Sequence, residues 1–148
     1  MKKNGKALLW GLFALYVLCL ALLLFQRRLQ PEQSFNLIPL RTIRGYFLIL
    51  GREDAAAEAF RPYAVTNFLG NLLAFLPLGL FLPLLFRRQR RFWLFLLTAA
   101  LCIAFVELLQ LLTRRGALDV DDLLLNLPGA ILGWLLWKLA RRRENKKG

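Results

Sequence analysis

Four stretches of the chain have the length of a membrane-spanning helix and almost no charged residue. Residues 7–25 and 64–86 contain no charge, residues 92–112 contain Glu107, and residues 123–140 contain Lys138 near their end. About 20 apolar residues cross a hydrocarbon core of about 30 Å as a helix. The runs are continuous rather than alternating, and a helix satisfies its backbone hydrogen bonds internally. The pattern predicts one domain over residues 1–148, an all-α bundle of four transmembrane helices.

Composition excludes a soluble globular protein. The hydrophobic fraction is 58%, against about 45–50% in ordinary soluble domains, and four such runs leave too little polar chain to cover them. The chain has no histidine, which excludes Ser-His-Asp and Cys-His catalysis and His-ligated metal sites. Cys19 and Cys102 lie inside spans and are expected to pack without a disulfide. No metal and no other cofactor is expected.

Lysine and arginine, which give the chain a net charge of +12, favour one end of the predicted bundle. Thirteen of the 21 lie in the N-terminal tail, the loop between the second and third spans and the C-terminal end, and eight lie in the other two loops. Because cytoplasmic segments are enriched in these residues, both termini are predicted to be cytoplasmic. The arginines of that face are interpreted as anchors on anionic lipid, with no nucleic-acid partner. The first span is interpreted as a retained helix, because its apolar run exceeds the roughly 7–15 residues of a signal peptide.

The first loop is long and partly apolar. Residues 34–50 read SFNLIPLRTIRGYFLIL, a short segment interrupted by Pro39 and Gly45. A re-entrant or interface-lying segment is favoured over a fifth span. Residues 53–60 (EDAAAEAF) predict a short helix that ends before Pro62.

Polar side chains recur at one membrane level, at the start of the second span, the end of the third and the start of the fourth. Helical spacing places each of three pairs on one face. The pairs are Asn67 with Asn71, Glu107 with Gln110, and Asp122 with Asn126. An unpaired ionisable residue at mid-membrane costs about 2.5–3.5 kcal/mol. These groups should therefore face the bundle interior, with Arg41, Arg44, Arg114 and Arg115 as the available cations for Glu107. Interhelical packing alone explains them equally well.

Small residues and prolines predict helix contacts and irregularities. Gly70 with Ala74, and Gly129 with Gly133, are spaced four apart and would permit close helix packing. Pro77, Pro83 and Pro128 are expected to kink or open their helices.

The connection TRRGALDVD at residues 113–121 has two interpretations. As a solvated turn it would use Asp121 to cap the following helix. As a recognition loop it would use Arg114 and Arg115 to bind phosphate, and its acids to bind a cation or an amine. Roles for Asp119 and Asp122 stay open.

Several separated motifs resemble the VanZ-like family of small bacterial membrane proteins. They are FNLIPLRTI at 35–43, NFLGNLLAFLPLGLFLPLL at 67–85, FVELLQLLTRRGALDVDDLLLN at 105–126 and PGAILGW at 128–134. Pro128 departs from the family pattern. The resemblance implies a bacterial plasma membrane protein and a link to resistance against teicoplanin, a lipidated glycopeptide, and it supplies no catalytic mechanism.

Three functions follow from these features. The leading hypothesis is non-enzymatic recognition, at the outer leaflet, of a membrane lipid, a lipid-linked envelope precursor or a lipidated antibiotic. Its ligand-binding residues would be Asn67, Asn71, Glu107, Gln110, Arg114, Arg115, Asp119, Asp122, Asn126, Arg41 and Arg44. The second hypothesis is an enzyme in which Glu107 works with Asp119 or Asp122 on a lipid-linked phosphate or sugar. The third is a structural or partner-binding membrane subunit.

Overall fold

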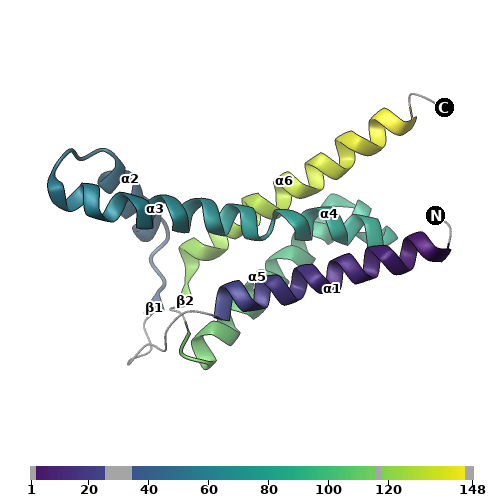
Figure 1. Cartoon of the computed structure of the whole chain (residues 1–148), viewed down its shortest axis with the longest axis horizontal. Coiled ribbons are helices and arrows are strands. Elements are labelled where there is room, and N and C mark those ends of the chain that lie inside the picture. The colour runs from purple at the N-terminus through teal and green to yellow at the C-terminus, as the bar shows by residue number, and fades with distance from the viewer. Residues whose placement is uncertain (1–2, 26–34, 116–117, 146–148) are drawn as a thin grey trace.

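The computed structural model describes residues 3–25, 35–115 and 118–145, and these are largely helical (Figure 1). The loop at 26–34, with two of the arginines used in the orientation count, lies outside the described residues. The elements in chain order are α1 (Lys3–Phe25), β1 (Phe35–Asn36), α2 (Arg41–Leu50), α3 (Ala55–Ala74), α4 (Leu76–Leu85), the 3-10 turn η1 (Arg87–Arg90), α5 (Phe92–Leu112), β2 (Leu118–Asp119) and α6 (Val120–Asn145).

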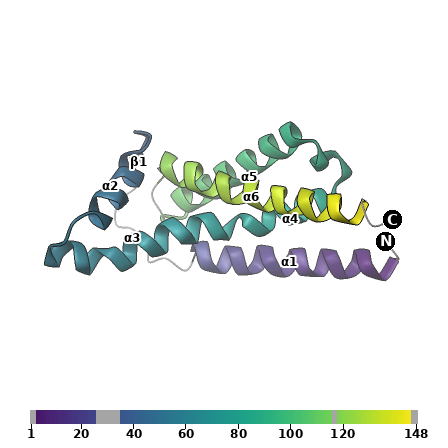
Figure 2. The same ribbon diagram turned by 90° about the horizontal axis from the view of Figure 1, so that it is seen from above.

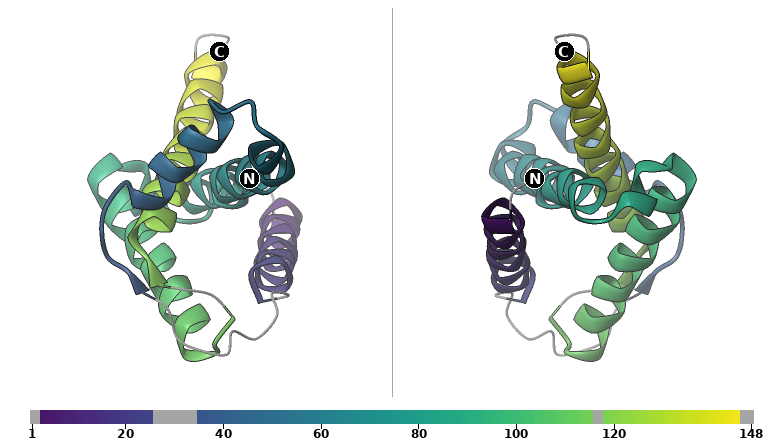
Figure 3. Two further views of the ribbon diagram at one scale, coloured as in Figure 1. Left: turned by 90° about the vertical axis from the view of Figure 1, so that its left-hand side faces the viewer. Right: turned by 90° about the vertical axis from the view of Figure 1, so that its right-hand side faces the viewer.

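Four helical segments are long and apolar enough to cross a membrane, which confirms the predicted all-α bundle. They are Asn4–Phe25, Ala55–Leu85, Phe92–Leu112 and Val120–Arg143. The beginning of α1 and the end of α6 lie at the same end of the molecule, and the α2–α3 hairpin projects at the other (Figure 2). Viewed along the bundle, α1 stands to one side of the other helices (Figure 3). The Tyr16 hydroxyl on α1 donates to the carbonyl of Ala74 at 2.9 Å, which joins α1 to the end of α3.

The second span differs from its prediction. It consists of two helices, α3 and α4, that meet at Phe75, with Pro77 in the first turn of α4. This break fits the expected opening near Pro77, since proline is favoured at a helix start. The predicted end before Pro62 is wrong, because α3 continues through that residue to Ala74. One missing N–H is tolerated there because a long run of helix-compatible apolar residues follows.

The helices cross closely at glycines. A Cβ added to Gly129 would lie 1.9 Å from the carbonyl oxygen of Leu72, and one added to Gly133 would lie 2.0 Å from that of Leu76. The predicted packing role of these two glycines is confirmed. The role predicted for Gly70 is wrong, because no atom of the described residues lies within 4 Å of a Cβ at that position. Sequence reasoning missed Gly79, where an added Cβ would lie 1.9 Å from the carbonyl oxygen of Ala130.

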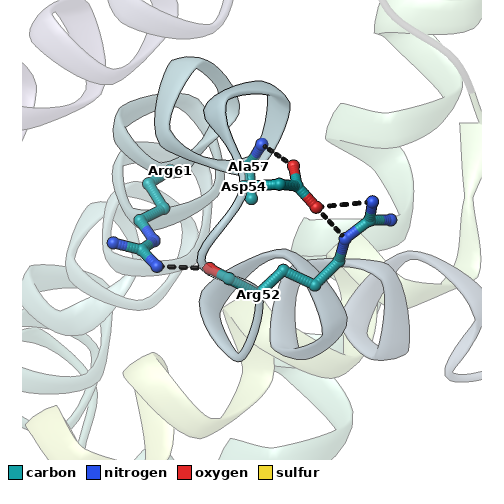
Figure 4. Close-up of polar contacts among 4 residues, drawn as sticks. All are labelled: Arg52, Asp54, Ala57 and Arg61. Atoms are coloured by element: carbon teal, nitrogen blue, oxygen red, sulfur yellow. Dashed lines mark hydrogen bonds and ion pairs between the residues drawn. The ribbon is translucent and has the colours of Figure 1, made fainter.

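A polar turn fixes the α2–α3 hairpin (Figure 4). Asp54 is the N-cap of α3 and accepts a hydrogen bond from the amide of Ala57 at 2.8 Å. Arg52 pairs with the same carboxylate at 2.6 Å, and Arg61 donates to the carbonyl of Arg52. These contacts return the chain from α2 into the second span. The placement of α2 as re-entrant or surface-lying stays a prediction.

Candidate functional site

Asp121, at the start of α6, holds the beginning of a different helix. Its side chain is fully buried, and its carboxylate accepts hydrogen bonds from the amides of Leu40 at 2.5 Å, Thr42 at 2.6 Å and Ile43 at 3.2 Å. Thr42 and Ile43 belong to the first turn of α2, and Leu40 is its N-cap residue, with φ 66° and no capping hydrogen bond from its side chain. A carboxylate at a helix N-terminus satisfies orphan donors and is favoured by the helix dipole.

The prediction that Asp121 caps its own helix is therefore wrong. Asp119 takes that role, because its Oδ1 accepts from the amide of Asp121 at 2.8 Å. Sequence spacing could not separate the two acids, since both stand at the start of one helix. The α2 amides lie about 80 residues away in sequence.

Asp119 also joins the first loop to α6. Its Oδ1 accepts from Asn36 Nδ2 at 2.9 Å, and its Oδ2 accepts from the Thr42 hydroxyl at 2.6 Å. The short strands pair in parallel at the same place, with Asn36 opposite Asp119. Sequence reasoning missed Asn36 and Thr42. One indication of their role was present in the sequence, since each is a polar residue within an otherwise apolar segment.

A pocket of about 170 Å³ opens beside this junction. Glu107 from α5 and Asp119 supply its acidic part, and Glu107 is 5% exposed. The rest of the lining is apolar and consists of Leu37, Ala104, Val120 and Leu123. Two predicted site residues from different elements are thus brought together. The pocket offers carboxylate oxygens to a hydrogen-bond donor or an amine, and apolar walls to a hydrocarbon part.

A second group of predicted residues lies between α3 and α6. Asn71 is buried, and its Nδ2 donates to Asp122 Oδ1 at 2.6 Å. Asn126, one turn further along α6, is 2% exposed, and its Oδ1 accepts no hydrogen bond from the described residues. Asn67 is half-buried and donates to the carbonyl of Tyr63 at 2.9 Å. The structure therefore joins Asn71 with Asp122, and it also bonds Asn67 to its own helix.

Gln110 and Arg115 act at the end of α1. The Gln110 side chain donates to the carbonyl of Leu24 at 3.1 Å, and the Arg115 guanidinium donates to that of Phe25 at 2.6 Å. The last carbonyls of a helix have no intrahelical partner, and the negative end of the dipole favours a cation there. These two side chains thus stabilise the C-terminus of the first span.

Comparison with known families decides what kind of protein this is. Residues 13–141 match the sequence profile of the family described as VanZ/LLP1. The chain belongs to the VanZ/LLP1 family. Protein VanZ from Enterococcus faecium is 30% identical over 151 residues, which cover 97% of this chain and 81% of that relative. No solved structure matches this VanZ-family chain.

The remaining arginines of the predicted site lie apart from the pocket. Arg41, Arg44 and Arg114 are exposed and are not among the residues that line it. Arg114 has φ 55° at the end of α5. Its amide donates to Leu111, and the next amide donates to Gln110, which is the Schellman arrangement of a helix end. In this VanZ-family protein the backbone of Arg114 thus has a clear structural role, and binding of an anionic headgroup by the three guanidinium groups stays a prediction.

Proposed function

We propose that this multi-pass VanZ-family protein recognises an amphiphile at the outer face of the bacterial plasma membrane, without catalysis, and that both of its termini are cytoplasmic. The pocket between α5, the first loop and the start of α6 is the recognition site. Glu107 and Asp119 accept hydrogen bonds from the polar end of the ligand, and the apolar lining takes its hydrocarbon part.

The observation that carries the proposal is the mixed lining of that pocket. Two carboxylates converge at a level where apolar side chains form the other walls, and burial makes a hydrogen bond to a charged acceptor strong. Ligands of this chemistry carry an amine, an amide or several hydroxyl groups next to an acyl or polyprenyl chain. A membrane lipid, a lipid-linked envelope precursor and a lipidated glycopeptide all have it.

Membership of the VanZ/LLP1 family, with the link to teicoplanin resistance that the resemblance implies, supports the last of these ligands. We propose that expression of this chain lowers the susceptibility of a bacterial host to a teicoplanin-type antibiotic. The exposed arginines at 41, 44 and 114 would then contact the anionic groups of the same ligand outside the pocket.

The experiment is lipidomics of the purified protein with a matched pair of variants. Glu107→Gln removes a pocket carboxylate, whereas Glu58→Gln makes the same change on the exposed first turn of α3. We expect one lipid class to be enriched with the native chain and with Glu58→Gln, and to be depleted with Glu107→Gln. Equal lipid profiles for all three proteins would contradict the proposal. If Glu107→Gln also lowered thermal stability in detergent, a packing role would be favoured.

A membrane enzyme is the second candidate, because Glu107 and Asp119 line one pocket. Asp119 already accepts three hydrogen bonds, from Asn36, Thr42 and the amide of Asp121. Its Oδ2 can accept one more from a ligand, but a carboxylate held in this way is a poor proton-transfer group. Asp122 is bonded to Asn71. Incubation with polyprenyl phosphates or lipid II, with and without Mg²⁺, tests this candidate. Turnover that is lost in Glu107→Gln would rank it first.

A further inference from the structure

A second concave surface lies at the opposite end of the molecule, where α4 connects to α5. Arg87, Arg88 and Arg91 line it together with Leu94, and it encloses about 430 Å³. The connection lies toward the end of the bundle where α6 ends (Figure 2). Three guanidinium groups around one hollow form an anion site in which each group can offer two parallel donors to a phosphate.

The turn that carries these arginines is fixed by its neighbours. Gln89 donates from its side chain to the Thr98 hydroxyl at 2.9 Å, and its carbonyl accepts from the Trp134 indole at 3.0 Å. Trp134 belongs to the hydrophobic core. One residue of η1 is thus fastened to α5 and to α6, while Arg87, Arg88 and Arg91 are exposed. The three cations start from a fixed backbone, which lowers the entropy that ligand binding must remove.

Positive charge is crowded at this turn. Partial burial lowers the pKa of Arg90, and the nearby charges of Arg141 and Arg87 lower it further. Among the side chains that the structure describes, no carboxylate forms an ion pair with the arginines of this turn. The arginines of this turn repel one another, so binding of an external anion there is electrostatically favourable.

The apolar surface next to the hollow indicates where that anion comes from. Leu94 lines the hollow, and Leu97, Leu101 and Leu108 follow on α5 at intervals of three to seven residues, with 39%, 59%, 62% and 46% of their surfaces exposed, respectively. Residues at this spacing share one face of a helix. A ligand with its phosphate in the hollow could lay a hydrocarbon chain along that face.

From this arrangement we infer that Arg87, Arg88 and Arg91 form a binding site for the phosphate of an anionic membrane lipid, with its acyl chain along Leu94 and Leu97. The site is separate from the Glu107 pocket and does not depend on the function proposed for it. It differs from general attraction of a basic face to an anionic membrane, because it assigns the binding to three particular side chains.

Two double variants with equal charge loss test the inference. Arg88→Gln with Arg91→Gln removes two lining cations. Arg142→Gln with Arg143→Gln removes two exposed cations of α6 that do not line the hollow. Native mass spectrometry from a neutral detergent, titrated with phosphatidylglycerol, measures how much lipid stays bound. We expect about a tenfold loss of affinity for the first pair, which corresponds to about 1.4 kcal/mol, and less than a threefold change for the second.

Further titrations identify the source of the phosphate and guard against misfolding. Phosphatidylcholine should bind weakly, and inorganic phosphate should not displace phosphatidylglycerol. Arg88→Lys with Arg91→Lys keeps the charge and the folding determinants but loses the planar fork, so its affinity should fall between those of the native chain and the glutamine pair. Equal losses in the two glutamine pairs would overturn the inference in favour of diffuse attraction. Displacement by inorganic phosphate would overturn the lipid as ligand, and native affinity in the lysine pair would overturn the site.

Discussion

The contact between the second and fourth spans depends on the absence of a side chain at Gly129. A Cβ there would lie 1.9 Å from the carbonyl oxygen of Leu72 and 2.8 Å from its carbonyl carbon. Ordinary contact begins at 3.4 Å, so Gly129→Ala must move α3 away from α6 by about 1.5 Å locally. The obstacle is backbone, which cannot rotate aside as a side chain would.

The size of the effect follows from two opposing contributions. Overpacking a well-fitted contact destabilises by about 1–3 kcal/mol, and alanine is favoured over glycine inside a helix by about 1 kcal/mol. Because the obstacle is backbone, the overpacking cost lies at the upper end of its range, and after the gain from alanine we expect Gly129→Ala to lower the free energy of unfolding by about 2 kcal/mol. Asn71 neighbours Leu72 in sequence, so its 2.6 Å hydrogen bond to Asp122 should lengthen as well.

Gly70→Ala is the matched control, since nothing in the part of the chain that the structure describes lies within 4 Å of its added Cβ. We expect this control to be unchanged or more stable by up to about 1 kcal/mol. Thermal unfolding in detergent, followed by the fluorescence of the tryptophans and by helical circular dichroism, measures both variants. Equal melting temperatures for the two variants would refute the reasoning, because they differ in what the new methyl group meets.

Three further predictions concern helix ends. Asp121→Asn should destabilise the protein by about 1–3 kcal/mol, since three backbone donors lose a buried, charged acceptor. Hydrogen exchange at the Thr42 amide should be faster than in the native chain. The amide of Ala57 and the Arg52 side chain hold the pKa of Asp54 below its usual value. The stabilisation from the Asp54 cap of α3 should thus be fully present above the pKa of about 3.9 that this carboxyl has in the unfolded chain, and it should be lost as pH falls through the lower pKa of the folded state. Hydrogen exchange at the Ala57 amide measures this effect, and its dependence on the cap should disappear in Asp54→Asn. Arg114→Gly should raise the melting temperature, with a gain of up to about 1 kcal/mol, because φ 55° suits glycine.

The spans were predictable because they depend on local composition. The third predicted span, 92–112, coincides with α5, Phe92–Leu112, because arginines and a turn bound its apolar run. The second span was harder to predict, because Pro62 disfavours a helix locally, whereas the apolar sequence after it favours one. Packing against α6 stabilises α3, and local sequence patterns do not include this tertiary contribution.

The candidate site was predictable as a layer but not as a set of pairs. Helical spacing predicted that Asn71, Glu107 and Asp122 lie at one level, and the structure bonds Asn71 to Asp122 and places Glu107 in a pocket with Asp119 at the start of α6. Spacing within one helix cannot say which neighbour a side chain meets. The partners of Asp119 and Asp121 therefore follow only from the fold, as does the bonding of Gln110 and Arg115 to the end of α1.

The carboxylate of Asp121 has a consequence for the order in which the chain is made. The amides that it satisfies stand 78 to 81 residues earlier in the sequence. During synthesis the first loop is made before α6, so these amides cannot bond to Asp121 until α6 is present. Correct insertion of that final helix is thus the event that completes the loop. A nascent chain stopped before α6 would carry an unfinished segment that quality-control proteases can recognise.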